Sequence, residues 1–278
     1  MSKVWFITGS ARGIGAEVAK AALAAGDRVV ATGRKLDQLQ AAYAGYDDRV
    51  LTVALDVADE AQSVAAVQAA VERFGRIDVL VNNAGFGHLG RFEEIEAADI
   101  ERQFATNVFG LFHVTRAVLP VMRRQRSGRI LNLSSIGGVL GFAGASVYCS
   151  TKFAVEGFSD SLALEVAPFG IHVTVVEPGF FRTDFLDGSS VRYGTREIAD
   201  YAGHSAEQRS TYDSYSHKQP GDPAKLAAAM VELADTPEPP RHFLAGSDAV
   251  ELAGGAVEQR RAEITAWRDR SVATDFAA

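Results

Sequence analysis

The chain of 278 residues contains one cysteine, Cys149, so an internal disulfide is excluded and a reducing cytoplasm is expected. It also lacks any apolar run of about 18 residues, the length that a membrane-spanning helix needs. Met1-Ser2-Lys3 leads directly into the strand-like segment 4–7 rather than into a signal peptide. We therefore expect a soluble, cytoplasmic protein without a membrane partner.

Positive charge is in deficit, and several motifs of other protein classes are missing. The 28 basic and 35 acidic residues give a formal net charge of −7, which argues against a nucleic-acid partner. The six histidines show no metal-ligand spacing and no cysteine pair supports zinc, so we expect no metal. The chain has no G-x-S-x-G motif, which excludes the common serine hydrolase arrangement.

Short β-branched runs alternate with longer helical patterns over the first 180 residues, which is typical of a parallel sheet covered by helices. We predict one α/β domain over residues 1–278, a doubly wound parallel sheet of about seven strands with helices on both faces. The predicted strands are 3–8, 28–32, 50–55, 77–82, 128–133, 171–176 and 242–245. The predicted helices are 13–25, 60–74, 93–124 with a bend near Asn107, 147–167, 223–234 and 248–268.

The stretch 183–222 is polar and is predicted to be irregular. It holds four of the seven tyrosines and begins with hydrophobic residues at Phe185 and Leu186. A loop of this length inside a compact domain is usually a lid or a binding segment, and we predict a substrate lid.

Tyr148 and Lys152 are the most informative pair in the sequence. Four residues apart on a helix, they share a face, so both can reach one pocket. A neighbouring cation favours the phenolate, and we expect Lys152 to lower the pKa of Tyr148 toward a useful acid/base range. Ser135 precedes them at a distance that keeps all three near one edge of the sheet.

A glycine-rich turn joins the first strand to the first helix, where a dinucleotide pyrophosphate would meet a helix N-terminus. Its spacing is G-x-x-x-G-x-G, in Thr8 to Gly15. The candidate cofactor residues of this turn are Gly9, Ser10, Arg12, Gly13, Ile14 and Gly15.

The second strand ends in Gly33-Arg34-Lys35, without the acidic residue that binds the ribose 2′-hydroxyl of NAD. Arginines at 12 and 34 suit a 2′-phosphate, because guanidinium–phosphate hydrogen bonds are charge-assisted. We therefore expect NADP, with Lys35 as a further contact.

Together these motifs make the chain resemble the short-chain dehydrogenase/reductase family, in its single-domain branch. The resemblance covers residues 3–183 and adds motifs at Asp56-Val57, Asn82-Asn83-Ala84-Gly85 and Pro178-Gly179. It implies adenine contacts at Asp56 and Val57, adenosine contacts at Asn83, Ala84 and Gly85, and nicotinamide contacts at Pro178, Gly179, Phe181 and Thr183. It also implies that Ser135, rather than Ser134, polarises the substrate.

We expect an NADP(H)-dependent oxidoreductase that acts on a small-molecule carbonyl/alcohol pair, with Tyr148 as acid/base. Asn107 could bend its helix and expose a carbonyl whose bound water relays protons to Lys152. The expected substrate pocket is apolar, formed by Ser135, Val139, Leu140, Phe142, Tyr148, Phe185, Phe86 and His88. The alternatives are an NADP-sensing binding protein without turnover and an epimerase or dehydratase of the extended branch.

The two long helical stretches carry more apolar surface than one sheet face needs. We expect Phe109, Phe112, Val114, Val118 and Met122, with Val155, Phe158, Leu162 and Val166, to leave an exposed patch. Such a patch usually meets a partner. The family resemblance also implies a homodimer or homotetramer through these helices.

Overall fold

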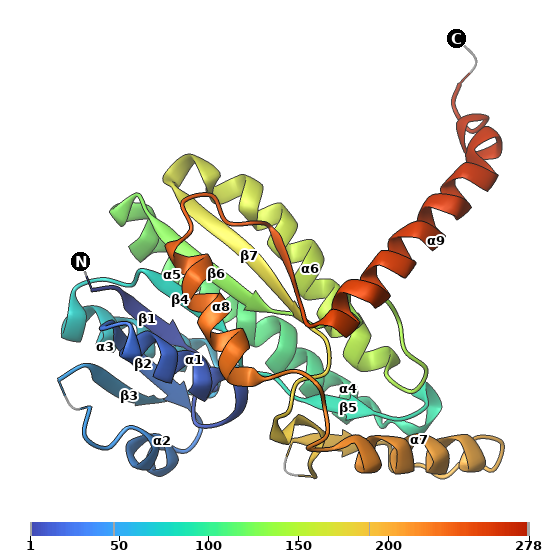
Figure 1. Cartoon of the computed structure of the whole chain (residues 1–278), viewed down its shortest axis with the longest axis horizontal. Coiled ribbons are helices and arrows are strands. Elements are labelled where there is room, and N and C mark those ends of the chain that lie inside the picture. The colour runs from blue at the N-terminus through green and yellow to red at the C-terminus, as the bar shows by residue number, and fades with distance from the viewer. Residues whose placement is uncertain (1, 47, 189, 277–278) are drawn as a thin grey trace.

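The computed structural model describes residues 2–46, 48–188 and 190–276. A seven-stranded parallel sheet runs through the molecule in the order β3-β2-β1-β4-β6-β7-β9 (Figure 1). The strands are β1 (Val4–Ile7), β2 (Arg28–Gly33), β3 (Val50–Ala54), β4 (Val79–Asn82), β6 (Gly128–Leu133), β7 (Ile171–Pro178) and β9 (His242–Ala245). The predicted α/β fold and all seven predicted strands are confirmed.

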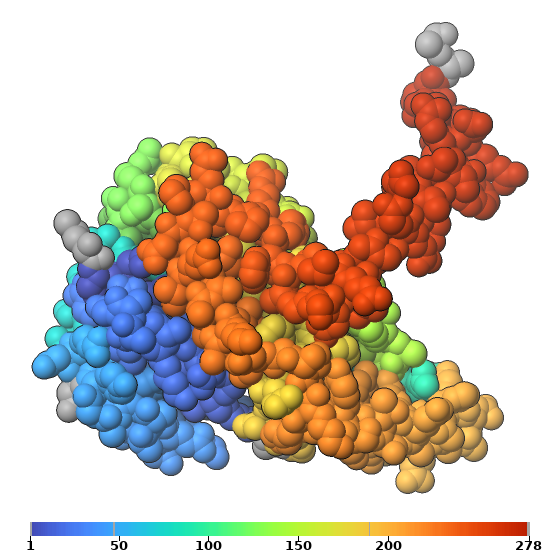
Figure 2. All heavy atoms as spheres, in the orientation of Figure 1, coloured from blue at the N-terminus to red at the C-terminus, as the bar shows by residue number. Residues whose placement is uncertain are grey.

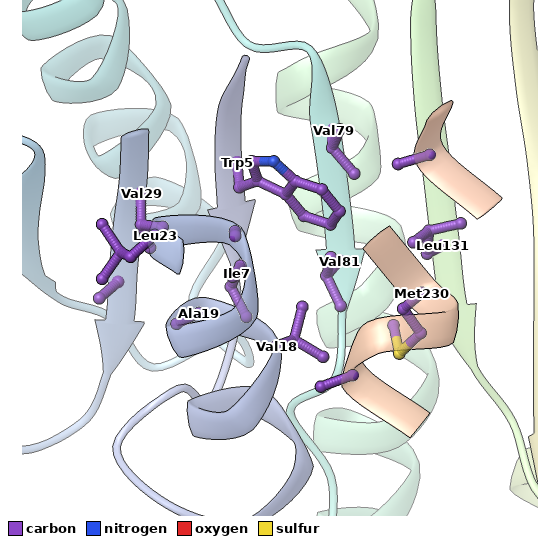
Figure 3. Close-up of a cluster of buried hydrophobic side chains, with 14 of the residues drawn as sticks. Trp5, Ile7, Val18, Ala19, Leu23, Val29, Val79, Val81, Leu131 and Met230 are labelled. Atoms are coloured by element: carbon purple, nitrogen blue, oxygen red, sulfur yellow. The ribbon is translucent and has the colours of Figure 1, made fainter. Parts of the chain in front are cut away.

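Side chains of alternate strand residues point to opposite faces, and each face is covered by its own helices. Trp5 and Ile7 pack with α1 (Gly13–Ala24), α2 (Leu36–Ala42) and α8 (Pro223–Asp235). Figure 3 shows Trp5 and Ile7 among Val18, Val79, Val81, Leu131 and Met230. Val4 and Phe6 pack on the other face with α3 (Glu60–Phe74), α5 (Gly110–Gln125) and α6 (Ser146–Val166).

The order of the strands reverses beside β1, because β2 pairs with one of its edges and β4 with the other. The loops after β1 and β4 therefore leave the sheet in different directions and open a crevice at the carboxyl ends of the strands. Ligands of doubly wound sheets bind at such a switch point. The fold thus brings the ends of β1, β2, β3, β4, β6 and β7 around one place.

A continuous helix runs through α4 (Ala97–Phe104), a π-helical turn η2 (Ala105–Phe109) and α5. The irregularity predicted near Asn107 is this π turn. The helix was predicted to begin at residue 93, but it begins at Ala97, after a short 3₁₀ turn η1 (Phe92–Glu94). Among the described residues, Ala97–Gln125 is the one helix long and apolar enough to cross a membrane by composition. Its α5 part packs on α3 and β4, as a helix of a globular core does.

The segment 183–222 has more regular structure than the sequence predicts. It contains a 3₁₀ turn η5 (Asp184–Leu186), a strand β8 (Val191–Tyr193) and a helix α7 (Ala202–Tyr215). Strand β8 pairs in parallel with β5 (Gly87–Leu89) and forms a second, two-stranded sheet. The prediction of an irregular loop was wrong. Helix α7 buries none of its residues, so the sequence has no apolar stripe that would have indicated a helix.

Most of the apolar patch expected on the long helices lies in the core. Val114, Val118, Met122, Leu162 and Val166 are buried against the sheet, and Val155 is fully buried as well. Phe158 is partly buried, and Phe112 packs against it with ring centroids 4.4 Å apart. Of the residues expected in this patch, only Phe109 is exposed. The sheet therefore covers most of the apolar surface of the two helices.

Candidate active site

A cleft of about 1210 Å³ lies at the carboxyl ends of the strands, with the glycine turn at one end and Tyr148 at the other. It brings together most of the predicted site residues. Gly9, Arg12, Gly13, Ile14, Arg34, Lys35, Asp56, Val57, Asn83, Ala84, Gly85, Ser135, Phe142, Tyr148, Lys152, Pro178, Gly179, Phe181, Thr183 and Phe185 all line it. Ser10, Gly15, Asn107, Val139 and Leu140 lie outside the lining.

The end of β1 is fastened to the end of β4 by reciprocal hydrogen bonds. The Thr8 hydroxyl accepts from the main-chain N–H groups of Asn83 and Ala84, both at 2.9 Å. The Asn83 amide donates to the carbonyls of Thr8 and Gly9 at 2.9 and 3.0 Å. These bonds fix the two loops that border the crevice, so the glycine turn has a rigid frame.

The glycine turn is shaped to let a ligand approach its backbone. Gly9 and Gly13 have φ values of +65° and +58°, which residues with a side chain rarely adopt. A Cβ at Gly15 would lie 2.5 Å from the Asn83 amide nitrogen. Arg12 is the N-cap of α1, its side chain makes no capping hydrogen bond, and the first turn holds no acidic residue. This uncapped helix start fits a phosphate, which favours main-chain N–H donors and the positive end of a helix dipole.

Ser10 supports the turn from behind. Its hydroxyl donates to the Thr32 carbonyl at 3.3 Å, and its own carbonyl accepts a 2.6 Å hydrogen bond from the buried Tyr43 hydroxyl. Burial raises the pKa of Tyr43 to about 12, so this donor keeps its proton. The contact with Tyr43 was not predicted from the sequence, because the two residues are separated by 33 positions.

Three cations stand at the glycine-turn end of the cleft. Arg34 and Lys35 follow the last residue of β2 and line the cleft with exposed side chains. Arg12 lines it from the glycine turn, and its guanidinium donates to the Ser190 hydroxyl at 2.8 Å. Arg12 therefore connects this end of the cleft to the segment 183–222.

Asp56 and Val57 line the same end of the cleft from the loop after β3. The Asp56 carboxylate accepts a hydrogen bond from the Ala58 N–H at 3.0 Å, which closes a tight turn. Val57 is buried against Gly110 of α5, where any Cβ would meet the Val57 side chain at 2.5 Å. The position of this loop is thus set by contact with α5.

Tyr148 reaches the cleft from the first turn of α6, beside Ser135 at the end of β6. Ser135 is the N-cap of a 3₁₀ turn, η3 (Ile136–Gly138), and its hydroxyl accepts from the Gly137 N–H at 3.1 Å. Burial raises the pKa of Tyr148 to about 12, and the hydrogen bond with Ser135 offsets part of this rise. The phenol is therefore protonated at neutral pH and can act as a proton donor.

The expectation that Lys152 lowers the pKa of Tyr148 was wrong for this arrangement. The Lys152 ammonium lies 5.7 Å from the centre of the Tyr148 ring and donates instead to the Leu133 carbonyl at 2.8 Å. Burial lowers the pKa of Lys152 itself to about 8, while the nearby Glu156 opposes the shift. Desolvation outweighs the Ser135 hydrogen bond at Tyr148 and the attraction of Glu156 at Lys152, and helical spacing alone cannot show how deeply a pair is buried.

Asn107 is buried and acts as a brace between three elements. Its side-chain amide donates to the Phe86 carbonyl at 3.0 Å and to the Thr151 hydroxyl at 3.1 Å, and its oxygen accepts from the Phe86 N–H at 3.1 Å. Thr151 directly precedes Lys152 on α6. Asn107 thereby holds the loop after β4 against α6. The π turn around Asn107 is the kind of helix irregularity that frees a backbone group.

Aromatic rings from segments far apart in the sequence form the substrate side of the cleft. Phe185 packs on Tyr148 with ring centroids 5.6 Å apart, and Phe142 lines the same region. The lining also includes residues that were not predicted individually from the sequence: Asp99, Arg102, Arg192, Tyr193 and Tyr212. The tyrosine-rich composition of 183–222 was a signal for Tyr193 and Tyr212, whereas no sequence pattern indicated Asp99, Arg102 or Arg192.

Two predicted residues of this region have different surroundings. Val139 lies outside the cleft lining and packs with Ile136 in the apolar cluster around Ala249 and Ala253. His88 does line the cleft and is buried. Burial lowers the pKa of His88, so its imidazole is neutral at pH 7.

The comparisons with known proteins agree with this geometry. The family model "short chain dehydrogenase" matches residues 3–192, and the chain belongs to the short-chain dehydrogenase family. Oxidoreductase BOA17 of Botryotinia fuckeliana is 45% identical over 99% of this chain and 100% of its own length. The crystal structure of a short-chain dehydrogenase from Streptomyces avermitilis is 43% identical, with a TM-score of 0.92 over 99% of this chain and 100% of that one. The chain is thus an oxidoreductase that acts on an alcohol/carbonyl pair.

Two further solved structures carry a nicotinamide cofactor. ElxO with NADP bound is 29% identical, with a TM-score of 0.75 over 90% of this chain and all of that one. The 3-ketoacyl-(acyl-carrier-protein) reductase from Brucella melitensis, complexed with NADH, is 28% identical, with a TM-score of 0.72 over 87% and 95% of the two chains. One of these two similar proteins holds NADP and the other holds NADH. Both cofactors contain a pyrophosphate, which fits the uncapped glycine turn of this chain.

Proposed function

We propose that this protein is an NADP(H)-dependent reductase or dehydrogenase that interconverts a hydrophobic ketone or aldehyde and its alcohol. The observation that carries the proposal is the Tyr148 phenol beside Ser135, with Lys152 one helical turn away, at the end of a cleft that begins at the glycine turn. A nicotinamide bound in the cleft supplies or accepts the hydride.

Each of the three residues has a separate task in this proposal. Tyr148 gives its proton to the carbonyl oxygen during reduction and takes it back during oxidation, because it is the titratable hydroxyl that is hydrogen-bonded to Ser135. Ser135 donates a hydrogen bond to the same oxygen. Lys152 stabilises the negative charge that Tyr148 acquires, and its lowered pKa of about 8 still leaves it mostly protonated at pH 7. Asn107 positions Lys152 through Thr151.

The preference for NADP rests on charge at the glycine-turn end of the cleft. The β2 end offers Arg34 and Lys35, and Arg12 approaches from the glycine turn. A 2′-phosphate would find two or three cations there, whereas the acidic residue that suits the NAD ribose is lacking.

The substrate class follows from the lining near Tyr148. Phe142, Phe185 and Leu186 give an apolar wall, and the neutral His88 adds no charge to it. Pockets of this composition bind largely apolar small molecules and orient them with a few polar groups. Tyr193 and Tyr212 can serve as such groups through their hydroxyls, and Asp99, Arg102 and Arg192 add charged side chains to the lining.

The purified protein can be tested by following NADPH absorbance with a panel of ketones and aldehydes of increasing apolar size, and by repeating each assay with NADH. We expect turnover with NADPH, with kcat/KM rising with apolar size. Equal rates with NADH would remove the NADP preference. Tight NADPH binding without turnover of any carbonyl or alcohol would instead favour a nucleotide-sensing protein.

A further inference from the structure

The C-terminal helix α9 (Ser247–Val272) leaves the body of the molecule and extends away from it (Figures 1 and 2). Only its first turns are fixed to the rest of the chain. Ala249 and Ala253 are buried against Ile136 and neighbouring apolar residues after β6. Every described residue from 257 to 276 is exposed.

The projecting part of α9 carries large apolar side chains on one edge. Val250, Val257 and Ile264 follow one another at intervals of seven residues, and Trp267 lies one turn further; their exposed fractions are 56, 61, 64 and 58%. Helices without tertiary packing are only marginally stable in water, and Gly254 and Gly255 weaken this one further. A partner that covers this edge would stabilise the helix.

The seven-residue spacing is that of a coiled coil. With Val250, Val257 and Ile264 at position a of each heptad, Trp267 falls at position d. Branched residues at a favour two-stranded pairs. The a and d residues form the apolar seam between the two helices. Arg260 also falls at d, and its long aliphatic stem can cover this seam while its charge stays in water. The pattern therefore suits one further helix of the same kind.

The charges beside the seam select the direction of pairing. In a parallel pair, position g of one helix faces position e of the other helix five residues further on. Glu263 at g then faces Arg268 at e, which is an attractive contact, whereas Asp275 lies beyond the end of α9 at Val272. An antiparallel pair would place the e residues Arg261 and Arg268 opposite each other.

The contacts that these residues make within the helix leave them available for pairing. Glu263 is bonded to Gln259, Arg268 approaches Asp269 at 3.8 Å, and Arg270 lies over the Trp267 ring at 5.0 Å. All are exposed contacts within one helix, which contribute little and rearrange easily.

We propose that α9 pairs in parallel with α9 of a second copy of this chain, through Val257, Ile264 and Trp267. The root of α9 packs on η3, which directly follows Ser135, so the pair would brace one wall of the substrate region in both copies. This contact is separate from any association through α5 and α6.

Disulfide cross-linking tests the pairing directly, because the native Cys149 is buried. Ile264→Cys places a thiol at the seam, and Ala262→Cys places one on the outward face as the matched control. Under a mild oxidant, Ile264→Cys should form covalent dimers at least about tenfold faster than the control, since pairing raises the effective concentration of the thiols. The rate should be independent of protein concentration while the assembly stays intact.

Three outcomes would overturn the proposal. Equal slow cross-linking of both variants would mean that the helices do not pair. Faster linking between Ile264→Cys and Trp267→Cys chains than between two Ile264→Cys chains would indicate an antiparallel pair. A third outcome would assign the apolar edge to a membrane surface: Ile264→Cys does not cross-link, the protein sediments with phosphatidylglycerol vesicles, and Ile264→Asp abolishes that sedimentation.

One further variant checks the proposed contact. Adding Val257→Asp to Ile264→Cys should reduce cross-linking to the level of Ala262→Cys.

Discussion

The Lys152 ammonium donates a hydrogen bond of 2.8 Å to the main-chain carbonyl of Leu133, the last residue of β6. Ser135 follows Leu133 by two residues, and Tyr148 precedes Lys152 by one helical turn. This bond therefore joins the two chain segments that carry the proposed proton-transfer residues. Because both partners are buried, the bond is protected from competition with water.

The first prediction concerns the proton donor. Tyr148→Phe should reduce turnover to less than about a tenth of the wild-type rate, because general acid catalysis typically contributes 10²–10⁴-fold. NADPH affinity, measured by fluorescence titration, should stay within a few-fold, since the ring still packs on Phe185. Tyr46→Phe, which removes an exposed hydroxyl outside the cleft, is the control and should retain full activity. A Tyr148→Phe variant with near-normal kcat would exclude Tyr148 as the acid.

The second prediction concerns the choice of cofactor. Replacing both Arg12 and Arg34 by alanine should reduce the preference for NADPH over NADH by at least about a hundredfold, because each charged hydrogen bond contributes ~1.5–3 kcal/mol. The ratio of kcat/KM values with the two cofactors measures this. Arg123→Ala, an exposed arginine on α5 outside the cleft, should leave the ratio unchanged. A double variant with the wild-type ratio would show that the phosphate is held by other residues.

The third prediction concerns residues 185–220, which we expect to act as a lid. Contacts at several points join them to the body: Arg12 to Ser190 at 2.8 Å, Gln208 to the Ala143 carbonyl at 2.6 Å, and β8 to β5. The exposed α7 has no buried residue, so its backbone should open readily without ligand. Hydrogen exchange should slow across this segment when NADP(H) and substrate are added, while residues 130–133 stay unchanged. Equal exchange with and without ligands would contradict the lid.

The sheet could be predicted from the sequence because its strands are buried apolar runs separated by helices, and this signal is local. The strands β5 and β8 could not, since each has three residues and their pairing joins positions about 100 residues apart. The helix α7 was missed for a different reason: it has no buried side, and so it has no apolar periodicity.

For the site, the sequence predicted which residues meet at the cleft, because their positions follow the ends of parallel strands. Their electrostatics depended on packing. The pKa of Tyr148 rises through burial, and Lys152 turns to the Leu133 carbonyl. Neither result can be derived from a spacing of four residues.

The fourth prediction concerns the oligomeric state. The exposed apolar patch on α5 and α6 that could hold a partner is smaller in the structure than the sequence suggested. Phe153 and Leu164 are exposed on one side of α6, and Phe109 is exposed at the start of α5. We expect a dimer or tetramer by light scattering at micromolar concentration. Leu164→Glu combined with Phe153→Glu should lower the mass, whereas Val64→Glu on α3 should not. A monomeric wild-type mass would contradict both this prediction and the pairing of α9.

The fifth prediction concerns a group of titratable side chains behind the active site. Glu156 follows Lys152 by one turn of α6, and its carboxylate lies 3.5 Å from the His242 Nδ1 atom. His242 also contacts Glu177 at 3.0 Å and Asp160 at 2.9 Å. Burial is the main reason that the pKa of Glu156 rises to about 7, and the charge of Glu177 adds to it, while Ser134 and His242 act against it. Burial alone would lower the pKa of His242, but the hydrogen bonds and charges of Glu177 and Asp160 raise it.

Both shifts have the same consequence for stability. The folded protein binds more protons than the unfolded chain between pH 4.5 and about 7 at Glu156, and again from pH 6.5 to the raised pKa of His242. The free energy of unfolding should therefore fall as the pH rises through this range.

The variant Glu156→Gln tests this effect, because it removes the contribution of Glu156. Its Tm should decline less than that of the wild type between pH 5 and 8, by about 3 °C or more. Thermal denaturation followed by circular dichroism measures this, with Glu165→Gln, an exposed carboxylate on the same helix, as the control. If Glu156→Gln keeps the wild-type decline, the carboxyl is not protonated in the folded protein and the proposed cause is wrong.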